Sequence, residues 1–298
     1  MKTTQATVYR ALQHQINKME DRLLDQRLSA ATGKRINKPS DDPSAVRPVL
    51  NARSQIQQSD RYLRSLGTAS DRLQIQDSHL DQVSNLLIRA QETTIAAGNG
   101  AASAADLQSY ANDIANIREE LYALANSQVD GKYIFAGFEE NTIPFPDTSD
   151  PFTYDGTSDE IRLEIAPGEK IQTNLTGDRL FQGAGIPGGI NLFDLLSQIE
   201  TSLTSNDPTA ALSHLDDLKA GSEQVSLMRS KMGNIAQRVE NAQLHMENVK
   251  IDMQEVLSRY EDVDIVETIT NLNQQQLAFE AALNVTGKVS ELSILNYL

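Results

Sequence analysis

Few segments of this 298-residue chain combine the residue types and the spacing that chemistry requires. Residues 183–188 read GAGIPG, a G-x-G-x-x-G pattern that cradles a pyrophosphate when it follows a buried strand and opens a helix. No hydrophobic strand precedes it, and Pro187 removes an amide that a phosphate would need. We therefore interpret this stretch as a flexible return linker.

The other groups that could do chemistry lack a site's spacing. The four histidines stand at positions 14, 79, 214 and 245, and none has a second ligand at metal-binding distance in sequence. A group of carboxylates could bind Ca²⁺, but its spacing does not match an EF-hand loop, and we interpret it as a solvated loop. It consists of Asp147, Asp150, Asp155, Asp159 and Glu160. With no triad or nucleophile-elbow signature either, we expect no enzyme activity and no cofactor.

Composition removes further classes of function. The net charge is −15 and the chain has no cysteine, so disulfides and thiolate chemistry are excluded and the compartment stays open. No element carries a clean basic face, which argues against nucleic acid as a partner. No apolar run approaches the roughly 20 residues that span a bilayer, and we expect neither membrane insertion nor a Sec-type signal.

The elements that dominate the chain are helices at its two ends. Apolar residues recur at helical spacing of three or four, at Val8, Leu12, Ile16, Met19 and Leu23 and again at Val249, Met253, Val256, Tyr260 and Val263. Such narrow stripes are buried best along another stripe. Residues 1–60 hold ten Lys/Arg against six Asp/Glu, whereas residues 240–298 hold three against ten. The two ends therefore attract each other, within one bundle or also between subunits.

Between these ends the pattern alternates between long helices and one irregular segment. Seams of apolar residues predict helices over 43–95 and 104–130, from about 191, and from 209 onward, with a hinge near 261–264. Residues 161–165 and 171–175 alternate as half-buried strands around Pro167-Gly168. The predicted fold is mainly α, with long nested coiled-coil helices from both chain ends and a small β-rich central insert. The predicted domains are a terminal coiled-coil domain (1–40 and 260–298), a helical bundle or rod (41–132 and 191–259) and the outer insert (133–190).

Four segments resemble the bacterial flagellins and their hook-associated relatives. They are residues 31–45 (ATGKRINKPSDDPSA), 87–100 (LIRAQETTIAAGNG), 125–137 (ANSQVDGKYIFAG) and 274–283 (QQQLAFEAAL). The aromatic ending of the third segment and the short insert resemble the hook-associated members more than the filament flagellins.

The resemblance implies a flagellin-like fold and a structural role in the flagellum. It implies a homo-oligomeric adaptor ring that joins hook to filament, with hook-associated protein 1 on the hook side and flagellin on the filament side. It also implies type III export from the cytoplasm with a chaperone on the C-terminal helix, followed by an extracellular location. A filament flagellin is the alternative, and a secreted coiled-coil effector or adhesin is a more distant one.

The resemblance also suggests which residues carry assembly. Gly33, Arg35, Asn37, Asp41 and Asp42 lie in the turn that would connect layers of the assembly, with Arg35 and the paired aspartates as contacts between subunits. The apolar stripes of the terminal helices would pair in the innermost tube. These candidate assembly residues are Leu12, Ile16, Met19, Leu23, Phe279, Leu283, Val289, Leu292 and Leu295.

Overall fold

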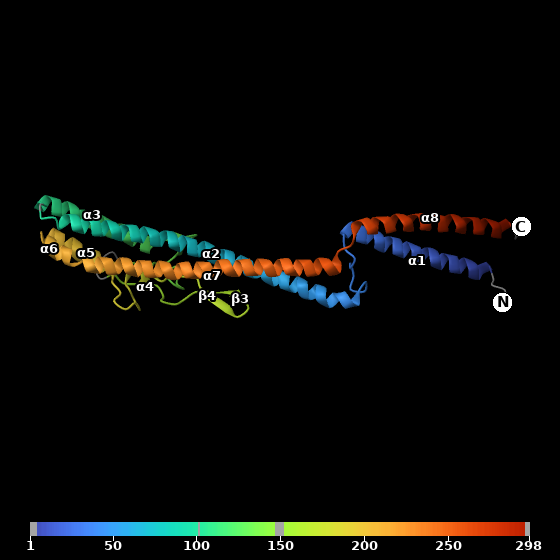
Figure 1. The fold of residues 1–298 in the computed structure, drawn as a ribbon, viewed down its shortest axis with the longest axis horizontal. Coiled ribbons are helices and arrows are strands. Elements are labelled where there is room, and N and C mark those ends of the chain that lie inside the picture. Colours follow the sequence, from blue (N-terminus) through green and yellow to red (C-terminus); the bar gives the residue numbers. More distant parts are fainter. Residues whose placement is uncertain (1–4, 101, 147–151, 296–298) are drawn as a thin grey trace. The chain divides into compact units, whose positions relative to one another are not determined.

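The computed structural model describes residues 5–100, 102–146 and 152–295, and it does not describe the side chains of residues 5, 6, 8, 9 and 289–295 (Figure 1). The helices are α1 (Gln5–Thr32), α2 (Pro43–Ala97), α3 (Ala104–Ala125), α4 (Gly177–Phe181), α5 (Leu192–Thr204), α6 (Pro208–Ser213), α7 (Leu215–Glu261) and α8 (Ile265–Leu295). The strands are β1 (Gln128–Val129), β2 (Lys132–Tyr133), β3 (Arg162–Ala166) and β4 (Glu169–Gln172). The chain forms two compact units, Met1–Ser59 with Asn248–Leu298 (unit 1) and Asp60–Glu247 (unit 2). The predicted fold class is confirmed, because long helices arise from both ends and the strands form only two-stranded sheets.

Unit 2 is a helical bundle with a continuous apolar core. Its core residues recur at three and four along α2 and α3, as in Leu80, Val83 and Leu87 and in Ile114, Ile117 and Leu121. Local signals fix the helix ends: Ser103 and Asp106 form a reciprocal capping box at the start of α3. The bidentate contact of Arg229 with Asp77, at 2.9 Å from Nε to Oδ1, ties α7 to α2. These contacts hold together the helices on which the insert packs.

The insert packs on the bundle through buried phenylalanine rings. Phe135, Phe145, Phe181 and Phe193 are all fully buried, and the centroids of Phe145 and Phe193 lie 5.2 Å apart. Asn126 fixes the main chain of Phe145, since its Nδ2 donates to the Phe145 carbonyl at 2.8 Å and its Oδ1 accepts the Phe145 N–H at 3.0 Å. The rings come from the insert and from α4 and α5, so they join the irregular segment to the helices.

Strands β3 and β4 confirm the two strands predicted around residues 167–168. They pair antiparallel with Leu163 opposite Ile171, and a register shift between Glu164 and Ala166 marks a bulge. A second hairpin was not predicted. Helix α3 ends at Ala125, five residues earlier than expected, and Asp130 and Gly131 form the turn between β1 and β2 with φ of 51° and 77°. Two successive positive φ values are typical of the type I′ turn that Asp-Gly favours.

Another expectation for unit 2 was wrong. The helix expected from residue 209 onward is interrupted, because α6 ends at Ser213, and His214 caps it before α7 begins. The GAGIPG stretch is a return linker, but it folds into tight turns in which Gly183, Gly185 and Gly188 have φ near 70°. Gln224 of α7 fastens the end of this linker, since its Oε1 accepts the Ile190 N–H at 2.8 Å and its Nε2 donates to the Ile190 carbonyl at 3.1 Å. The glycines therefore allow the positive φ values that these turns require.

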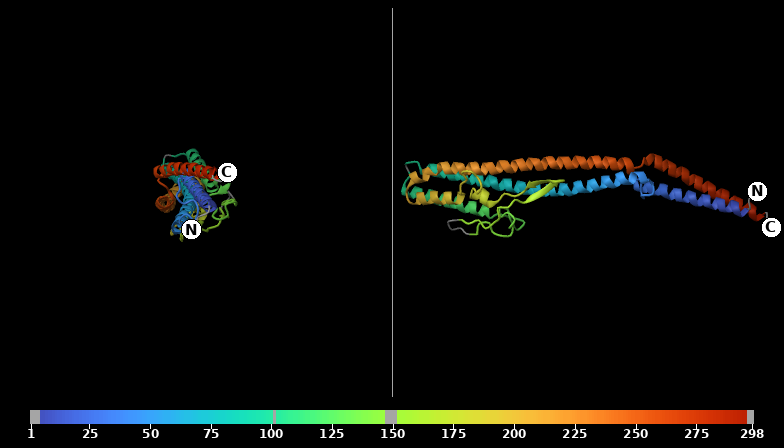
Figure 2. Two further views of the ribbon diagram at one scale, coloured as in Figure 1. Left: turned by 90° about the vertical axis from the view of Figure 1, so that its right-hand side faces the viewer. Right: turned by 90° about the horizontal axis from the view of Figure 1, so that it is seen from below.

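Unit 1 pairs the two ends of the chain. Helices α1 and α8 lie side by side in Figures 1 and 2 and run antiparallel, because the last turn of α1 and the first turn of α8 meet at one joint. The first turns of α2 and the last turns of α7 complete the unit. Its buried apolar side chains include Leu23, Ile36, Ala45, Val49 and Ala52, a set with no aromatic ring. Unit 1 therefore has a thinner core than unit 2.

Candidate functional site

The joint of unit 1 is built from the loop 33–42, the last residue of α7 and the link 262–264 between α7 and α8. Gly33 ends α1 with φ of 69°, and its N–H donates to the Ser29 carbonyl at 2.9 Å, as expected for a glycine C-cap. The two segments pair as an isolated antiparallel bridge between Lys34 and Asp262. The N–H of Arg35 donates to the Glu261 carbonyl, and the N–H of Val263 donates to the Gly33 carbonyl at 3.1 Å. Backbone pairing thus fixes where α1 and α8 meet.

A buried carboxylate holds the same joint from inside. The side chain of Glu261 is 2% exposed, and it accepts a hydrogen bond from Lys34 Nζ at 3.0 Å and another from Arg53 of α2. A carboxylate removed from water requires such partners. One side chain from α7 therefore connects the loop and the second helix. Sequence reasoning placed a hinge at residues 261–264 but missed this role of Glu261, for which the only signal was an acidic residue at a helix end facing a basic N-terminal segment.

The predicted loop residues all have partners within unit 1. Arg35 donates to the Tyr260 carbonyl at 2.9 Å and to Asp42 Oδ2 at 3.1 Å, and Asn37 Nδ2 donates to the Lys34 carbonyl at 2.9 Å. Asp41 Oδ2 accepts the N–H groups of Asn37 at 3.0 Å and Lys38 at 2.8 Å. These bonds are intramolecular, so a role of Arg35, Asp41 and Asp42 between subunits stays a prediction.

Asp42 is the N-cap of α2. Its Oδ1 accepts the N–H of Ser44 at 3.1 Å and of Ala45 at 3.3 Å. The hydrogen bond from the Ser44 hydroxyl, followed by that from Arg35, holds the pKa of Asp42 below its ordinary value. The backbone N–H groups of Lys38 and Asn37 lower the pKa of Asp41 in the same way. Both carboxylates are therefore stabilised as anions by the loop that they fold.

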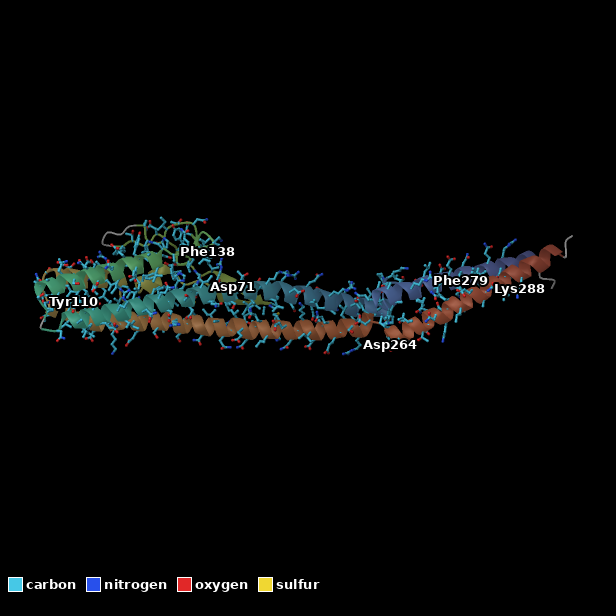
Figure 3. The ribbon with its side chains drawn as sticks, turned by 90° about the horizontal axis from the view of Figure 1, so that it is seen from above. Asp71, Tyr110, Phe138, Asp264, Phe279 and Lys288 are labelled. Atoms are coloured by element: carbon cyan, nitrogen blue, oxygen red, sulfur yellow. The ribbon has the colours of Figure 1, made fainter. Side chains whose placement is uncertain are left out.

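The contact between α1 and α8 follows heptad spacing on both helices. On α1 the less exposed positions include Leu12, Ile16, Met19 and Leu23, with Leu23 only 5% exposed. On α8 they include Thr268, Leu272, Gln275, Phe279, Ala282 and Thr286, which recur at four, three, four, three and four, and also Asn271 and Gln276 beside them. This inner face of α8 is thus largely polar or small, apart from Leu272 and Phe279. Figure 3 labels Phe279 on this helix and Asp264 just before it.

Large apolar side chains occupy the other sides of α8. Val266 is 77% exposed, Leu277 67% and Val285 55%. Ile269 is 48% exposed, and Leu283, one of the predicted assembly residues, is 46% exposed. We call Val266, Ile269, Leu277 and Val285 the outer face of α8. Among the predicted assembly residues, the side chains of Val289, Leu292 and Leu295 lie outside the described part of the structure.

Two cavities gather the predicted residues within unit 1. A cavity of about 410 Å³ lies between the helices of the pair, and Leu23, Leu24, Phe279 and Leu283 contribute its apolar walls. A second, of about 520 Å³, lies at the joint, where Arg35, Asn37 and Asp41 face the residues 262–264. The structure therefore brings the loop residues together at one end of the pair, and joins Leu23 with Phe279 and Leu283 farther along.

None of the helices within the described ranges has the length and apolar character needed to cross a membrane. In the same part of the chain, no three His, Asp or Glu side chains gather as a group that could hold a metal ion.

Comparison with known proteins identifies the family. The model of the bacterial flagellin N-terminal helical region matches residues 4–140, and that of the C-terminal helical region matches residues 215–298. Flagellar hook-associated protein 3 of Escherichia coli (strain K12) is 28% identical over 285 residues, covering 89% of each chain. A flagellin of Halalkalibacterium halodurans is 25% identical over 265 residues, covering 85% of each.

Solved structures share the fold. The hook-associated protein-3 of Legionella pneumophila matches with a TM-score of 0.63 and 15% identity over 71% of this chain and 98% of its own. A structure described as the flagellar junction protein of the same organism gives a TM-score of 0.54 at 15% identity, over 63% of this chain and 98% of that one. Since the two flagellin regions match in order and a relative aligns along most of its length, the chain belongs to the bacterial flagellin family, with similarity to flagellar hook-associated protein 3.

Proposed function

We propose that this protein is the adaptor that joins hook to filament, assembled as a ring of identical subunits. Membership of the flagellin family makes it a structural component of the flagellum, which is extracellular and which it builds with hook and filament proteins. The finer assignment draws on its similarity to hook-associated protein 3. We assign hook-associated protein 1 to its hook side and flagellin to its filament side.

The outer face of α8 is the observation that supports assembly. In the single chain, α8 gives α1 a largely polar seam, while Val266, Leu277 and Val285 are more than half exposed. A helix that is apolar on several sides requires several partners. The intramolecular pair supplies one, and neighbouring subunits supply the others. A subunit ring whose two axial faces differ could then hold a different protein on each side.

The same exposed face accounts for a chaperone before export. We propose that the chain leaves the cytoplasm through the flagellar type III apparatus, and that a cytoplasmic partner covers α8 until then. An exposed apolar helix would otherwise promote aggregation at the concentrations of synthesis. The partner would cover Leu277 and its neighbours. Helix α1 would compete only weakly for α8, because the face of α8 that it contacts is largely polar.

Electron microscopy of a strain that lacks the gene tests the junction role. We expect bare hooks, with flagellin shed into the culture medium, because the filament would have no base on which to nucleate. Expression of the intact gene in that strain should restore filaments. Filaments that attach normally in the deletion strain would contradict the proposal.

The alternative role is that of a filament flagellin, which the similarity to the Halalkalibacterium halodurans flagellin favours. Immunogold labelling separates the two roles in wild-type cells. A junction protein is labelled at one position between hook and filament, whereas a flagellin is labelled along the filament.

A further inference from the structure

Unit 2 contains a cavity of about 380 Å³ that the assembly role does not use. It lies between α2, the β1–β2 hairpin and the segments that precede β3 and follow β4. Both apolar and charged side chains line it. The apolar lining is Ile75, Val129, Tyr133, Ile134 and Ile161. This volume falls in the range of sites for small ligands.

Gln76 lines the cavity and has an incomplete set of hydrogen bonds. Its side chain is 3% exposed, and its Nε2 donates to the Thr173 carbonyl at 3.2 Å. Its Oε1 is buried and accepts no hydrogen bond within the described ranges of the chain. A buried amide oxygen without a donor is uncommon in folded proteins and costs free energy. This acceptor therefore fits a ligand that supplies an N–H or O–H group.

The charged lining selects the sign of that ligand. Arg72 Nη1 lies 3.2 Å from Glu140 Oε1, and Lys132 contacts the other oxygen of the same carboxylate. Burial alone would raise the pKa of Glu140, but the hydrogen bond from Lys132 and the charge of Arg72 outweigh it and hold the pKa below its ordinary value. Both cations of the lining are thus engaged. Asp71 and Asp130 also line the cavity, and no described group forms an ion pair with either.

We propose that this cavity binds an aliphatic cation, an alkyl chain that ends in a guanidinium or ammonium group. The alkyl part would lie against Ile75, Ile134 and Ile161, as lysine and arginine stems do on apolar surfaces. The charged end would donate to Gln76 Oε1 and be attracted by Asp71 and Asp130. Figure 3 marks Asp71 on α2. A free alkylamine or alkylguanidine and the side chain of an arginine or lysine from another protein share this chemistry.

The test compares two probes of equal shape on the full-length chain. n-Butylguanidinium carries the charge, and n-butylurea replaces it with a neutral group of the same outline. We expect the cation to shift the methyl resonances of Ile75, Ile134 and Ile161 and the side-chain amide of Gln76, with an affinity at least tenfold above that of the urea. Shifts spread over the acidic surface, with Gln76 unmoved, would overturn the proposal.

Conservative variants test whether the two carboxylates attract the cation. Asp71→Asn with Asp130→Asn removes both carboxylates, and asparagine tolerates the positive φ of 51° at position 130. We expect about tenfold weaker binding of n-butylguanidinium. The matched control, Asp113→Asn on the exposed surface of α3, should leave binding unchanged. An equal loss in the control, or none in the double variant, would refute a defined site.

The two sources of the cation give different results in assembly. If a protein side chain is the natural occupant, the double variant also weakens assembly of the junction and added n-butylguanidinium competes with it. If a free cation is the occupant, assembly is unchanged while binding of the probe is lost. Both results support the site, and each identifies where the bound cation comes from.

Discussion

The carboxylate of Glu261 connects three segments of unit 1 through two ion pairs. Because it is 2% exposed while Lys34 and Arg53 are 42% and 48% exposed, the cations stay hydrated when the carboxylate is removed. We expect Glu261→Ala to destabilise the joint by about 1–3 kcal/mol. Amide hydrogen exchange of Arg35 and Val263, whose N–H groups donate across the joint, measures this opening.

Glu255 is the matched control for this substitution. It lies on the exposed side of the same turns of α7, so Glu255→Ala should leave the exchange of both amides within the error of the measurement. If the two variants behaved alike, the ion pairs of Glu261 would contribute nothing to the joint.

Asp41 and Asp42 make the joint sensitive to acid. Their folded-state pKa values lie below the ordinary value of 3.8, so the stability that they contribute is complete above that pH and is lost as the pH falls through the folded values. We expect the loop to loosen below about pH 4. Asp41→Asn with Asp42→Asn, which keeps a side-chain acceptor at each position, should remove this acid step from an NMR titration of the Ser44 and Ala45 amides. An unchanged acid step would assign it to other groups.

Residue-scale prediction from sequence succeeded where the reason was local. The strands around Pro167-Gly168, for example, were predicted from the alternation of the residues beside them. The contact of Arg35 with the Tyr260 carbonyl could not be found in this way, because the two residues are 225 positions apart in sequence. Glu261 and Gln76 were missed for the same reason, since burial of a polar side chain depends on what folds over it.

At the scale of elements, α8 presents two faces of different character. The inner face pairs with α1, whereas the outer face, with Leu277 at 67% exposure, is left uncovered by the described residues of the chain. We expect Leu277→Asp to leave the isolated protein folded and to block assembly or chaperone capture, because assembly would bury an unpaired charge. Circular dichroism reports the fold, and motility with electron microscopy reports assembly.

The control for that variant is Asn273→Asp, which adds the same charge at an exposed polar position of α8. It should assemble nearly normally. Loss of assembly in both variants would mean that added charge alone is harmful, and the outer face would lose its special role.

Helices with long seams were predictable, but their ends and faces were less so. Helix α2 continues through Pro48, which lies near its start, so the apolar spacing predicted the helix despite the proline. The inner face of α8 could not be read from apolar residues because it contains Thr268, Gln275 and Thr286, while larger apolar residues point elsewhere. The β1–β2 hairpin carried the Asp-Gly signal, and it was masked by the helical seam that precedes it.

At the scale of the whole molecule, the two units differ in how much they bury. Unit 2 encloses rings such as Phe135 and Phe193, whereas the core of unit 1 is made of aliphatic side chains. Thin packing lowers the free energy of local opening. We therefore expect proteases to cut residues 1–35 and 260–298 of the soluble monomer before unit 2. Limited proteolysis with mass spectrometry measures this, and full protection of both ends at micromolar concentration would count against assembly-dependent order.

The joint also sets an order of folding. Lys34 and Glu261 are 227 residues apart in sequence, so closing their contact in an unfolded chain means closing a very long loop. Contacts of α2 with α3 need no such closure, and they form sooner. Under the proposed export, a chain that emerges N-terminus first lacks one half of its terminal pair until its last helix is free. Because α8 lies at the far end of the chain from α1, the terminal pair is the last part to form. The surface through which we propose that subunits assemble is therefore completed last.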